Sequence, residues 1–204
     1  MACYIFGAGE MTPLRSLPQP GDYVIAADGG WTACCAVGVI PDLLLGDFDS
    51  LATVPDFACV ERVPVEKDDT DMLLAVKRGL ELGHREFHLY GGMGGRRTDH
   101  TVANLQTLLY LAQRRACGWL YGNGEVYTAI HNGTITLPEK PNGILSVFCL
   151  GKDAQGVSIR GAQYELKNAV LTAGFPLGVS NHFVGNPVQV SVCDGSLLLG
   201  LLDE

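Results

Sequence analysis

The feature that most constrains the fold is a short apolar run, Leu43 to Leu45, that ends in Gly46 and leads into Asp47 and Asp49. A run of this length followed by glycine is typical of a buried strand that ends at the edge of a sheet. If the backbone stays extended beyond the glycine, residues i and i+2 point to the same side of the chain. Both carboxylates could then bind one hard cation such as Mg²⁺, so the pattern predicts a metal-binding edge.

Two further segments combine acidic residues with helix starts or glycines. Residues Glu66 to Asp71 precede an amphipathic run, and residues Arg96 to His100 follow the glycine-rich stretch Gly91 to Gly95. Glycines allow a ligand to approach the backbone closely, and the free N–H groups at a helix start bind phosphate oxygens. Arginines and a carboxylate-bound cation neutralise phosphate charge, so these segment ends indicate phosphate chemistry.

The first 122 residues alternate short apolar runs with helical patterns, which favours an α/β fold with a mainly parallel sheet. The expected strands are Cys3 to Phe6, Tyr23 to Ala27, Leu43 to Leu45, Ala58 to Val63, Phe87 to Tyr90 and Trp119 to Tyr121. One helix is expected to begin at the N-cap Thr70 and to end at Gly83. A second begins near Thr98, with an apolar face made of Val102, Leu105, Leu108, Leu109 and Ala112.

Beyond about residue 123 the helical period disappears, which predicts a small all-β sandwich over residues 123–204. Asn132-Gly133 is a hairpin signal between two of its strands. The clearest strands are Val126 to Ile130, Thr134 to Leu137, Ile144 to Leu150, Gln163 to Leu166, Val188 to Cys193 and Ser196 to Leu201. We expect a domain boundary near Gly122-Asn123-Gly124, without a long linker.

Composition excludes several classes of protein. The net charge of −8 argues against a nucleic-acid surface, which concentrates Lys and Arg. No apolar run reaches the roughly 18 to 20 residues that a membrane-spanning helix needs, and the first residues lack the basic region of a signal peptide, so we expect a cytoplasmic protein without a membrane association. Seven scattered cysteines, mostly in apolar segments, indicate reduced thiols in the core.

Five segments in this order and spacing resemble the thiamine pyrophosphokinase family. They are Ala27-Asp28-Gly29-Gly30, Pro41-Asp42 with Gly46-Asp47-Phe48-Asp49-Ser50, Lys67-Asp68-Asp69-Thr70-Asp71, Gly91 to His100 with Asn104, and Ser180-Asn181. The resemblance implies a Rossmann-like sheet with helices on both faces in residues 1–122, followed by a thiamine-binding β-sandwich in residues 123–204. It also implies a homodimer with thiamine bound near the interface, and a Mg²⁺-dependent reaction in which ATP and thiamine give AMP and thiamine diphosphate.

Pyrophosphoryl transfer requires the thiamine hydroxyl to attack the β-phosphorus of ATP in line, while a metal grips the flanking oxygens. We assign the metal to Asp47, Asp49 and Asp71, with Arg96 as a further catalytic residue. Without the resemblance, such carboxylates are also consistent with solvent-exposed turns. Asp71 could also simply stabilise the start of its helix, because a negative charge there interacts favourably with the helix dipole. The resemblance adds nucleotide-binding roles for Asp28, Gly29, Thr70, Gly94, Gly95, Arg97, Asp99 and His100.

The sequence departs from the family in two places. Two residues separate Arg96 from Asp99, where the family usually has one, so either Arg96 or Arg97 could contact phosphate. For His100 and Asn104, a structural role at the start of the helix is as consistent with the sequence as a role in the reaction.

The second departure lies in the thiamine segment. By resemblance Ser180 and Asn181 hydrogen-bond the aminopyrimidine, and Phe183 packs on a ring, although an ordinary strand-end phenylalanine is an equal interpretation. His182 stands where the family commonly has Glu, which removes a negative charge near a cationic substrate.

Two other functions fit parts of the pattern. A non-catalytic nucleotide-binding module would use the glycines, and a Mg²⁺-dependent nucleotide pyrophosphohydrolase would pass the pyrophosphoryl group to water. The phosphate loop with Gly-Lys-Ser/Thr and the protein-kinase motifs are both absent from the sequence. The Ser180-Asn181 segment distinguishes the thiamine kinase from the hydrolase, because the two differ in the acceptor that they bind.

Overall fold

The computed structural model describes residues 1–48, 57–64, 66 and 68–203, and it divides into two units. The first comprises Met1–Thr107 and Gly118–Asn123, and the second Leu108–Cys117 and Gly124–Glu204. Elements up to residue 121 are β1 (Cys3–Phe6), β2 (Tyr23–Ala27), α1 (Gly30–Ala36), β3 (Leu43–Gly46), β4 (Val60–Arg62), α2 (Asp71–Glu81), β5 (Glu86–Tyr90), α3 (Thr98–Gln113) and β6 (Cys117–Tyr121). The later strands are β7 (Glu125–His131), β8 (Thr134–Leu137), β9 (Ile144–Cys149), β10 (Ala154–Arg160), β11 (Leu166–Leu171), β12 (Gly178–His182), β13 (Val188–Ser191) and β14 (Ser196–Leu202).

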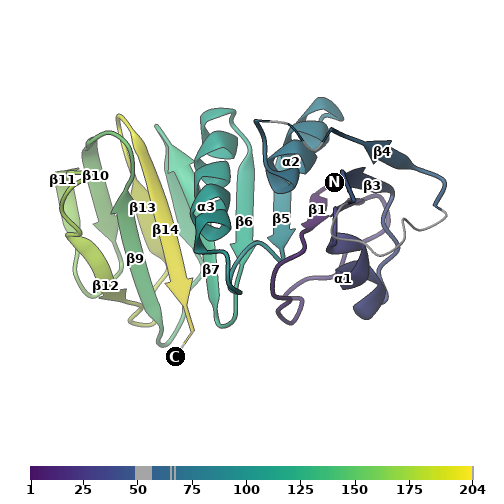
Figure 1. The fold of residues 1–204 in the computed structure, drawn as a ribbon. Coiled ribbons are helices and arrows are strands. Elements are labelled where there is room, and N and C mark those ends of the chain that lie inside the picture. The colour runs from purple at the N-terminus through teal and green to yellow at the C-terminus, as the bar shows by residue number, and fades with distance from the viewer. Residues whose placement is uncertain (49–56, 65, 67, 204) are drawn as a thin grey trace. The chain divides into compact units, whose positions relative to one another are not determined.

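The sheet of the first unit has the order β6-β5-β1-β2-β3-β4 (Figure 1). Strands β5, β1, β2, β3 and β4 pair in parallel, which confirms the predicted α/β class with a mainly parallel sheet. After β1 the chain adds strands on one side, and it later returns to place β5 on the other side. The carboxyl ends of β1 and β5 therefore form a topological switch point, where open α/β sheets bind their ligands.

Helix α2 packs closely on the sheet because it carries a glycine at the contact. A Cβ on Gly79 would lie 2.6 Å from the Phe87 ring and 3.0 Å from the Cys3 sulfur. Burial raises the pKa of the Cys3 thiol to about 12, and likewise that of Cys34. None of the seven cysteines, all of which the structure describes, forms a disulfide, but the prediction of core thiols is wrong for the exposed side chains of Cys35, Cys59 and Cys193.

The helix ends follow their sequence signals in α2. The Thr70 hydroxyl accepts a hydrogen bond from the Leu73 N–H at 3.2 Å, and Gly83, one residue past the Leu82 C-cap, has a φ of +93°. Both features confirm the predicted start and end, since a left-handed glycine closes the last turn.

The predicted apolar face of α3 is partly wrong. Val102 is 52% exposed, whereas Thr107, Leu108 and Leu111 are buried together with Asn104. The buried stripe therefore follows Asn104, whose polar side chain turns inward to bind a neighbouring loop.

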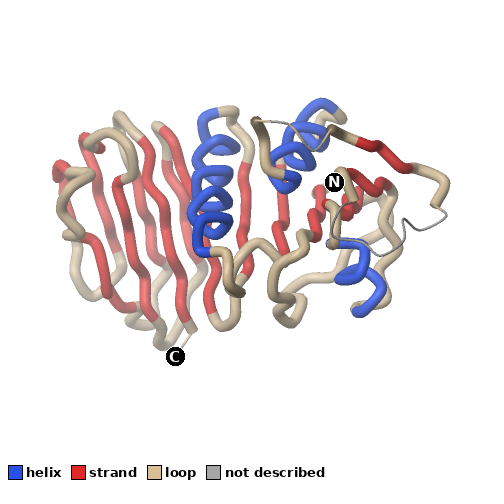
Figure 2. Tube along the Cα trace, in the orientation of Figure 1, coloured by secondary structure: helices blue, strands red, loops and turns tan. Residues whose placement is uncertain are grey.

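In the second unit the strands pair antiparallel in the orders β12-β9-β14-β7 and β11-β10-β13-β8. Figure 2 shows that this part of the chain is built almost wholly of strands and loops. This confirms the predicted all-β, sandwich-like region. Inward side chains alternate with exposed ones along β10 and β13, whereas β14 is buried from Ser196 to Leu201. Such continuous burial is typical of a central strand covered on both faces.

Three local predictions for this unit are wrong. The Asn132-Gly133 turn does not form a hairpin, because β7 pairs with β14 whereas β8 pairs with β13 in the other sheet. The strand predicted from Gln163 is a turn up to Glu165, and β11 begins only at Leu166. Strands β10 and β12 were not expected, because glycine and asparagine interrupt their apolar alternation.

One helix of the first unit was also not expected. Helix α1 spans seven residues and has no side-chain cap, so it lacks both of the usual sequence signals. None of the helices in the described part of the chain combines the length and apolar character needed to cross a membrane.

Candidate functional site

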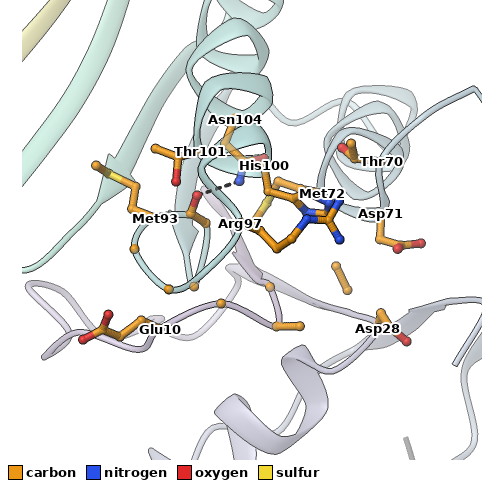
Figure 3. Close-up of a pocket in the computed structure, with 18 of the residues that line it drawn as sticks. Glu10, Asp28, Thr70, Asp71, Met72, Met93, Arg97, His100, Thr101 and Asn104 are labelled. Carbon is orange, nitrogen blue, oxygen red and sulfur yellow. Dashed lines mark hydrogen bonds between the residues drawn. The ribbon is translucent and has the colours of Figure 1, made fainter. Parts of the chain in front are cut away.

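A cavity of about 690 Å³ opens at the carboxyl ends of β1 and β5, in the first unit (Figure 3). We call it the switch-point cavity. Its lining comprises Gly7 to Glu10, Ala27, Asp28, Thr70 to Met72, Gly91 to Arg97, His100, Thr101 and Asn104. Three of the five segments that carried the sequence prediction thus contribute to one site, which lies where the strand order places a ligand.

Two glycine-containing loops form the floor of the cavity by pairing backbone to backbone. The Gly7 N–H donates to the Tyr90 carbonyl and the Gly9 N–H to the Gly91 carbonyl, both at 2.8 Å. A Cβ on Gly9 would lie 2.5 Å from the Gly91 oxygen, and one on Gly91, whose φ is +65°, would lie 2.4 Å from the Gly7 oxygen. Larger residues cannot fit this contact, so the glycines are needed for the loops to meet.

The loop after β1 is a functional element that the sequence prediction missed. Gly7-Ala8-Gly9 directly follows the first strand, and this position was the available signal. The signal is weak because the loop leads to another strand rather than to a helix, unlike a dinucleotide-binding glycine loop.

Two predicted carboxylates lie on one side of the cavity. Asp28 follows β2 with a φ of +49° and is 8% exposed, and its N–H donates to the Leu45 carbonyl at 2.7 Å. Asp71 stands in the first turn of α2, next to Thr70. Figure 3 shows both carboxylates on the side of the cavity away from Glu10.

The predicted Asp47–Asp49 pair is not established as a site. Asp47 is half-buried and is not among the described residues that line the cavity, and Asp49 lies outside the described residues. Between them Phe48 has a φ of +62°, so the assumption of an extended backbone is wrong there. The metal-ligand role of Asp47 and Asp49 therefore stays a prediction.

The described residues supply two carboxylate ligands for a metal, not a complete coordination shell made by the protein. Within those residues, no group of three His, Cys, Asp or Glu side chains is arranged to hold an ion. Asp28 and Asp71 nevertheless place oxygen donors on the same wall of the cavity. Mg²⁺ is usually bound by one or two carboxylates together with substrate phosphates and water, so this donor set fits that ion.

The two arginines at the start of α3 differ in their partners. Arg97 grips Asp99 through Nε to Oδ1 at 3.0 Å and Nη2 to Oδ2 at 2.8 Å, which lowers the pKa of Asp99 to about 2. Arg96 also lines the cavity, and it has no hydrogen bond or ion pair with any described residue. The guanidinium of Arg96 is therefore available to a ligand, and Arg97 lines the same cavity while it pairs with Asp99, which does not line it. Which of the two arginines contacts phosphate stays a prediction.

Asn104 has the structural role that the sequence left open. Its side chain is 5% exposed, and Nδ2 donates to the Gly92 carbonyl at 2.7 Å, drawn as the dashed line in Figure 3. Helix α3 thereby holds the glycine-rich loop Gly91 to Gly95 in place through this hydrogen bond. His100 lies one turn earlier, exposed on the cavity wall.

The remaining predicted nucleotide-binding residues divide into two groups. Thr70, Gly94 and Gly95 line the cavity. Gly29 is the N-cap of α1 and does not line it within the described residues.

The residues predicted to bind thiamine belong to the second unit. The side chains of two of them, Asn181 and Phe183, make contacts within that unit. Oδ1 of Asn181 accepts the N–H groups of Tyr164 and His182, both at 2.9 Å, and Nδ2 donates to the Tyr164 carbonyl at 2.7 Å. Phe183 is 3% exposed, with the ammonium of Lys140 5.6 Å from its ring centre.

Ser180 differs from both of these residues. It is exposed and has a φ of +60°, and its backbone N–H donates to the Ser146 hydroxyl at 3.2 Å. Its role in thiamine binding, and that of the other two residues, stays a prediction.

Comparison with known proteins covers both units. The family description "Thiamin pyrophosphokinase, catalytic domain" matches residues 14–118, and "Thiamin pyrophosphokinase, vitamin B1 binding domain" matches residues 133–197. A thiamine pyrophosphokinase of Bacillus subtilis is 26% identical over 182 residues, which is 86% of this chain and 85% of that protein.

Solved structures agree with this match. A thiamine pyrophosphokinase structure from Bacillus subtilis has a TM-score of 0.90 at 24% identity and covers 100% of both chains. One from Geobacillus thermodenitrificans has a TM-score of 0.87 at 27% identity, covering 100% of this chain and 98% of that one. The fold of the whole chain is therefore similar to theirs.

Proposed function

Because the chain belongs to the thiamin pyrophosphokinase family, we propose that it transfers a pyrophosphoryl group from ATP, with Mg²⁺, to the hydroxyl of thiamine. Family membership makes it a thiamine diphosphokinase. What we propose beyond family membership is that the nucleotide is ATP, that the metal is Mg²⁺, and which residues bind them.

The observation that carries this proposal is the arrangement of charges in the switch-point cavity. Carboxylates Asp28 and Asp71 lie on one wall, and Arg96 stands at the start of α3 beside Gly94 and Gly95. The first N–H groups of a helix and an adjacent arginine bind phosphate oxygens, whereas carboxylates need a cation between them and a phosphate. The cavity therefore fits a polyphosphate with a bound divalent ion.

Positioning is the main contribution of the protein to such a reaction, because phosphoryl transfer needs little covalent chemistry from side chains. Asp28 and Asp71 would hold Mg²⁺, which when bound neutralises charge on the polyphosphate oxygens. Arg96 stabilises negative charge on the transferred and leaving groups. Asn104 and the paired glycine loops keep the phosphate-binding backbone in one conformation.

Thiamine is proposed to bind to the second unit through residues 133–197, the part that matches the vitamin B1 binding domain. Ser180 is the candidate for a direct hydrogen bond, because it is exposed. Asn181 supports that segment through its three hydrogen bonds to Tyr164 and His182.

We also propose a homodimer. Strand β12 is an edge strand, and Phe175, Leu177 and Val179, within or just before it, are 65%, 52% and 40% exposed. Exposed apolar side chains beside an unpaired strand edge are normally covered by a partner. Light scattering at working concentration tests the proposal, and a monomer contradicts it.

The dimer also has a functional test. Inactive Asp71→Asn chains are mixed with chains that fail to bind thiamine, under conditions that allow exchange. Recovered activity means that one working site draws residues from two chains, and no recovery after proven exchange places each site within one chain.

The proposed reaction is tested by incubating the protein with ATP, Mg²⁺ and thiamine while AMP and thiamine diphosphate are measured together. We expect both products to form in equal amounts and only when thiamine is present. AMP formation without thiamine diphosphate would instead indicate a nucleotide pyrophosphohydrolase. Absence of both products would contradict the proposed function.

A further inference from the structure

Glu10 occupies a defined place on the wall of the switch-point cavity. It follows the Gly7-Ala8-Gly9 loop, whose hydrogen bonds to Tyr90 and Gly91 fix the position of the chain just before it. Its side chain lies along the facing loop, because a Cβ on Gly94 would be 2.8 Å from Oε2 and 3.6 Å from Cδ of Glu10. Gly94, with a φ of +76°, thus leaves room for this carboxylate.

The carboxylate of Glu10 is available to a ligand. It is exposed, and among the residues that the structure describes it has no hydrogen bond or ion pair. Figure 3 places it on the side of the cavity opposite Asp28 and Asp71. The family match begins at residue 14, so it assigns no role to Glu10.

Charge decides which part of a ligand Glu10 can contact. An ionised carboxylate only accepts hydrogen bonds, and it repels phosphate groups. Because Asp28 and Asp71, the carboxylates that would hold the cation, lie on the opposite side of the cavity (Figure 3), the partner of Glu10 should carry hydrogen-bond donors and lie beyond the polyphosphate. The cavity volume of about 690 Å³ is in the range of small-molecule and cofactor sites, so the same cavity has room for more than the phosphates.

We propose that Glu10 accepts hydrogen bonds from the two ribose hydroxyls of the nucleotide, an inference that rests on the proposed function. The two carboxylate oxygens match a pair of neighbouring hydroxyl donors, as acidic residues do in other nucleotide-binding α/β folds. Thiamine is a less suitable partner, because the region matching the vitamin B1 binding domain, residues 133–197, contributes no described residue to this cavity.

The test measures equilibrium binding by calorimetry to the intact protein, with Mg²⁺ present, for ATP, dideoxy-ATP, which lacks both hydroxyls, and inosine triphosphate, which lacks the adenine amine. Hydrogen bonds to a charged group are worth roughly tenfold to a hundredfold in affinity. The parent protein should therefore bind ATP at least about tenfold more tightly than dideoxy-ATP. Glu10→Ala should lose that preference while binding dideoxy-ATP as the parent does.

The matched control is Glu139→Ala, which removes an exposed carboxylate of the second unit and should retain the preference. Melting curves establish that Glu10→Ala is folded, which its exposure leads us to expect. In turnover, Glu10→Ala should raise KM for ATP and leave KM for thiamine unchanged.

Three results would overturn the proposal. Glu10→Ala could keep the preference for ATP over dideoxy-ATP. It could instead lose discrimination against inosine triphosphate, which would place the adenine amine at Glu10. It could also raise KM for thiamine alone, which would place thiamine there. Because binding is measured without turnover, these outcomes are distinct from a failure of the proposed function, which would appear as a parent protein that binds nucleotide but makes no thiamine diphosphate.

Discussion

The switch-point cavity and the Ser180–Phe183 segment were both predicted from short polar motifs, yet their side chains are used differently. In the cavity the paired glycine loops and the Asn104 side chain hold the structure, whereas Asp28, Asp71 and Arg96 line the space that a ligand would enter. In the second segment the side chain of Asn181 itself holds the turn that contains Tyr164.

The difference shows that a motif residue marks a site without revealing whether it binds the ligand or supports the residue that does. Backbone hydrogen bonds leave side chains available, whereas a side chain that hydrogen-bonds the backbone of a neighbouring turn cannot bind a ligand without losing those bonds. Substitutions in the cavity should therefore lower activity with little loss of stability. Substitution of Asn181 should instead lower stability more than it lowers activity.

The largest expected effect is that of Asp71→Asn. Loss of a metal-binding carboxylate should lower kcat at least about a hundredfold to a thousandfold, the cost of removing one transition-state stabiliser. The melting temperature should stay close to that of the parent, because Thr70 rather than Asp71 caps the helix. Rates and melting curves are measured on the same preparations.

Asp68→Asn is the control for this variant, because it removes an exposed carboxylate from the same segment. It should change the rate by less than about twofold. If Asp71→Asn also kept a rate close to that of the parent, the assignment of the acidic wall would be wrong.

Arg96→Ala and Arg97→Ala compare two neighbouring arginines. Arg96→Ala should lower kcat/KM for ATP about tenfold or more, since its guanidinium is available to phosphate. Arg97→Ala should have a smaller effect on the rate and should return the pKa of Asp99 from about 2 toward its ordinary value, which NMR titration of the carboxylates detects. Equal, mild effects on the rate would contradict a phosphate-binding role for this segment.

Asn181→Ala tests the other side of the comparison. It removes three part-buried hydrogen bonds, which should together cost about 1–3 kcal/mol of unfolding free energy in urea. Ser180→Ala should leave stability nearly unchanged and raise KM for thiamine. A fully stable Asn181→Ala protein would show that the side chain is not needed for the fold.

The smallest expected effect is a pH dependence of stability from His88 in the first unit. Its ring stacks between Tyr4 and Tyr121, and burial lowers its pKa below the usual value. The unfolded chain then binds a proton more readily, so this contribution is fully present above about pH 6.5 and is lost as the pH falls below that value. His88→Gln should flatten the decline in stability between about pH 7 and pH 5, measured by urea unfolding. An unchanged decline would assign it to other groups.

Sequence reasoning identified most strands of the first unit because each is a short apolar run with turn residues on both sides. It identified the site because glycines and carboxylates follow strand ends, which a parallel sheet brings to one edge. It missed α1, which has neither a cap nor a long repeat, and it misread Asn132-Gly133 as a hairpin. A turn signal fixes the local backbone, but tertiary packing decides which sheet each flanking strand joins.

The same limit applies to the site itself. Nothing in the sequence shows that Arg97 is paired with Asp99 while Arg96 is available, or that Asn181 is buried, because these facts depend on side-chain partners. The left-handed backbone at Phe48 also contradicts the simple period-two argument for Asp47 and Asp49. Phenylalanine gives no local signal for that conformation.

The most direct measurement of the central claim follows a phosphorus label from ATP into products. With Mg²⁺ and thiamine present, ATP labelled at the β-phosphorus should give labelled thiamine diphosphate, and ATP labelled at the α-phosphorus should give labelled AMP and no labelled thiamine compound. Asp71→Asn should lower both signals together. Label from the β-position in ADP, in inorganic pyrophosphate or in thiamine monophosphate would contradict pyrophosphoryl transfer by attack on the β-phosphorus.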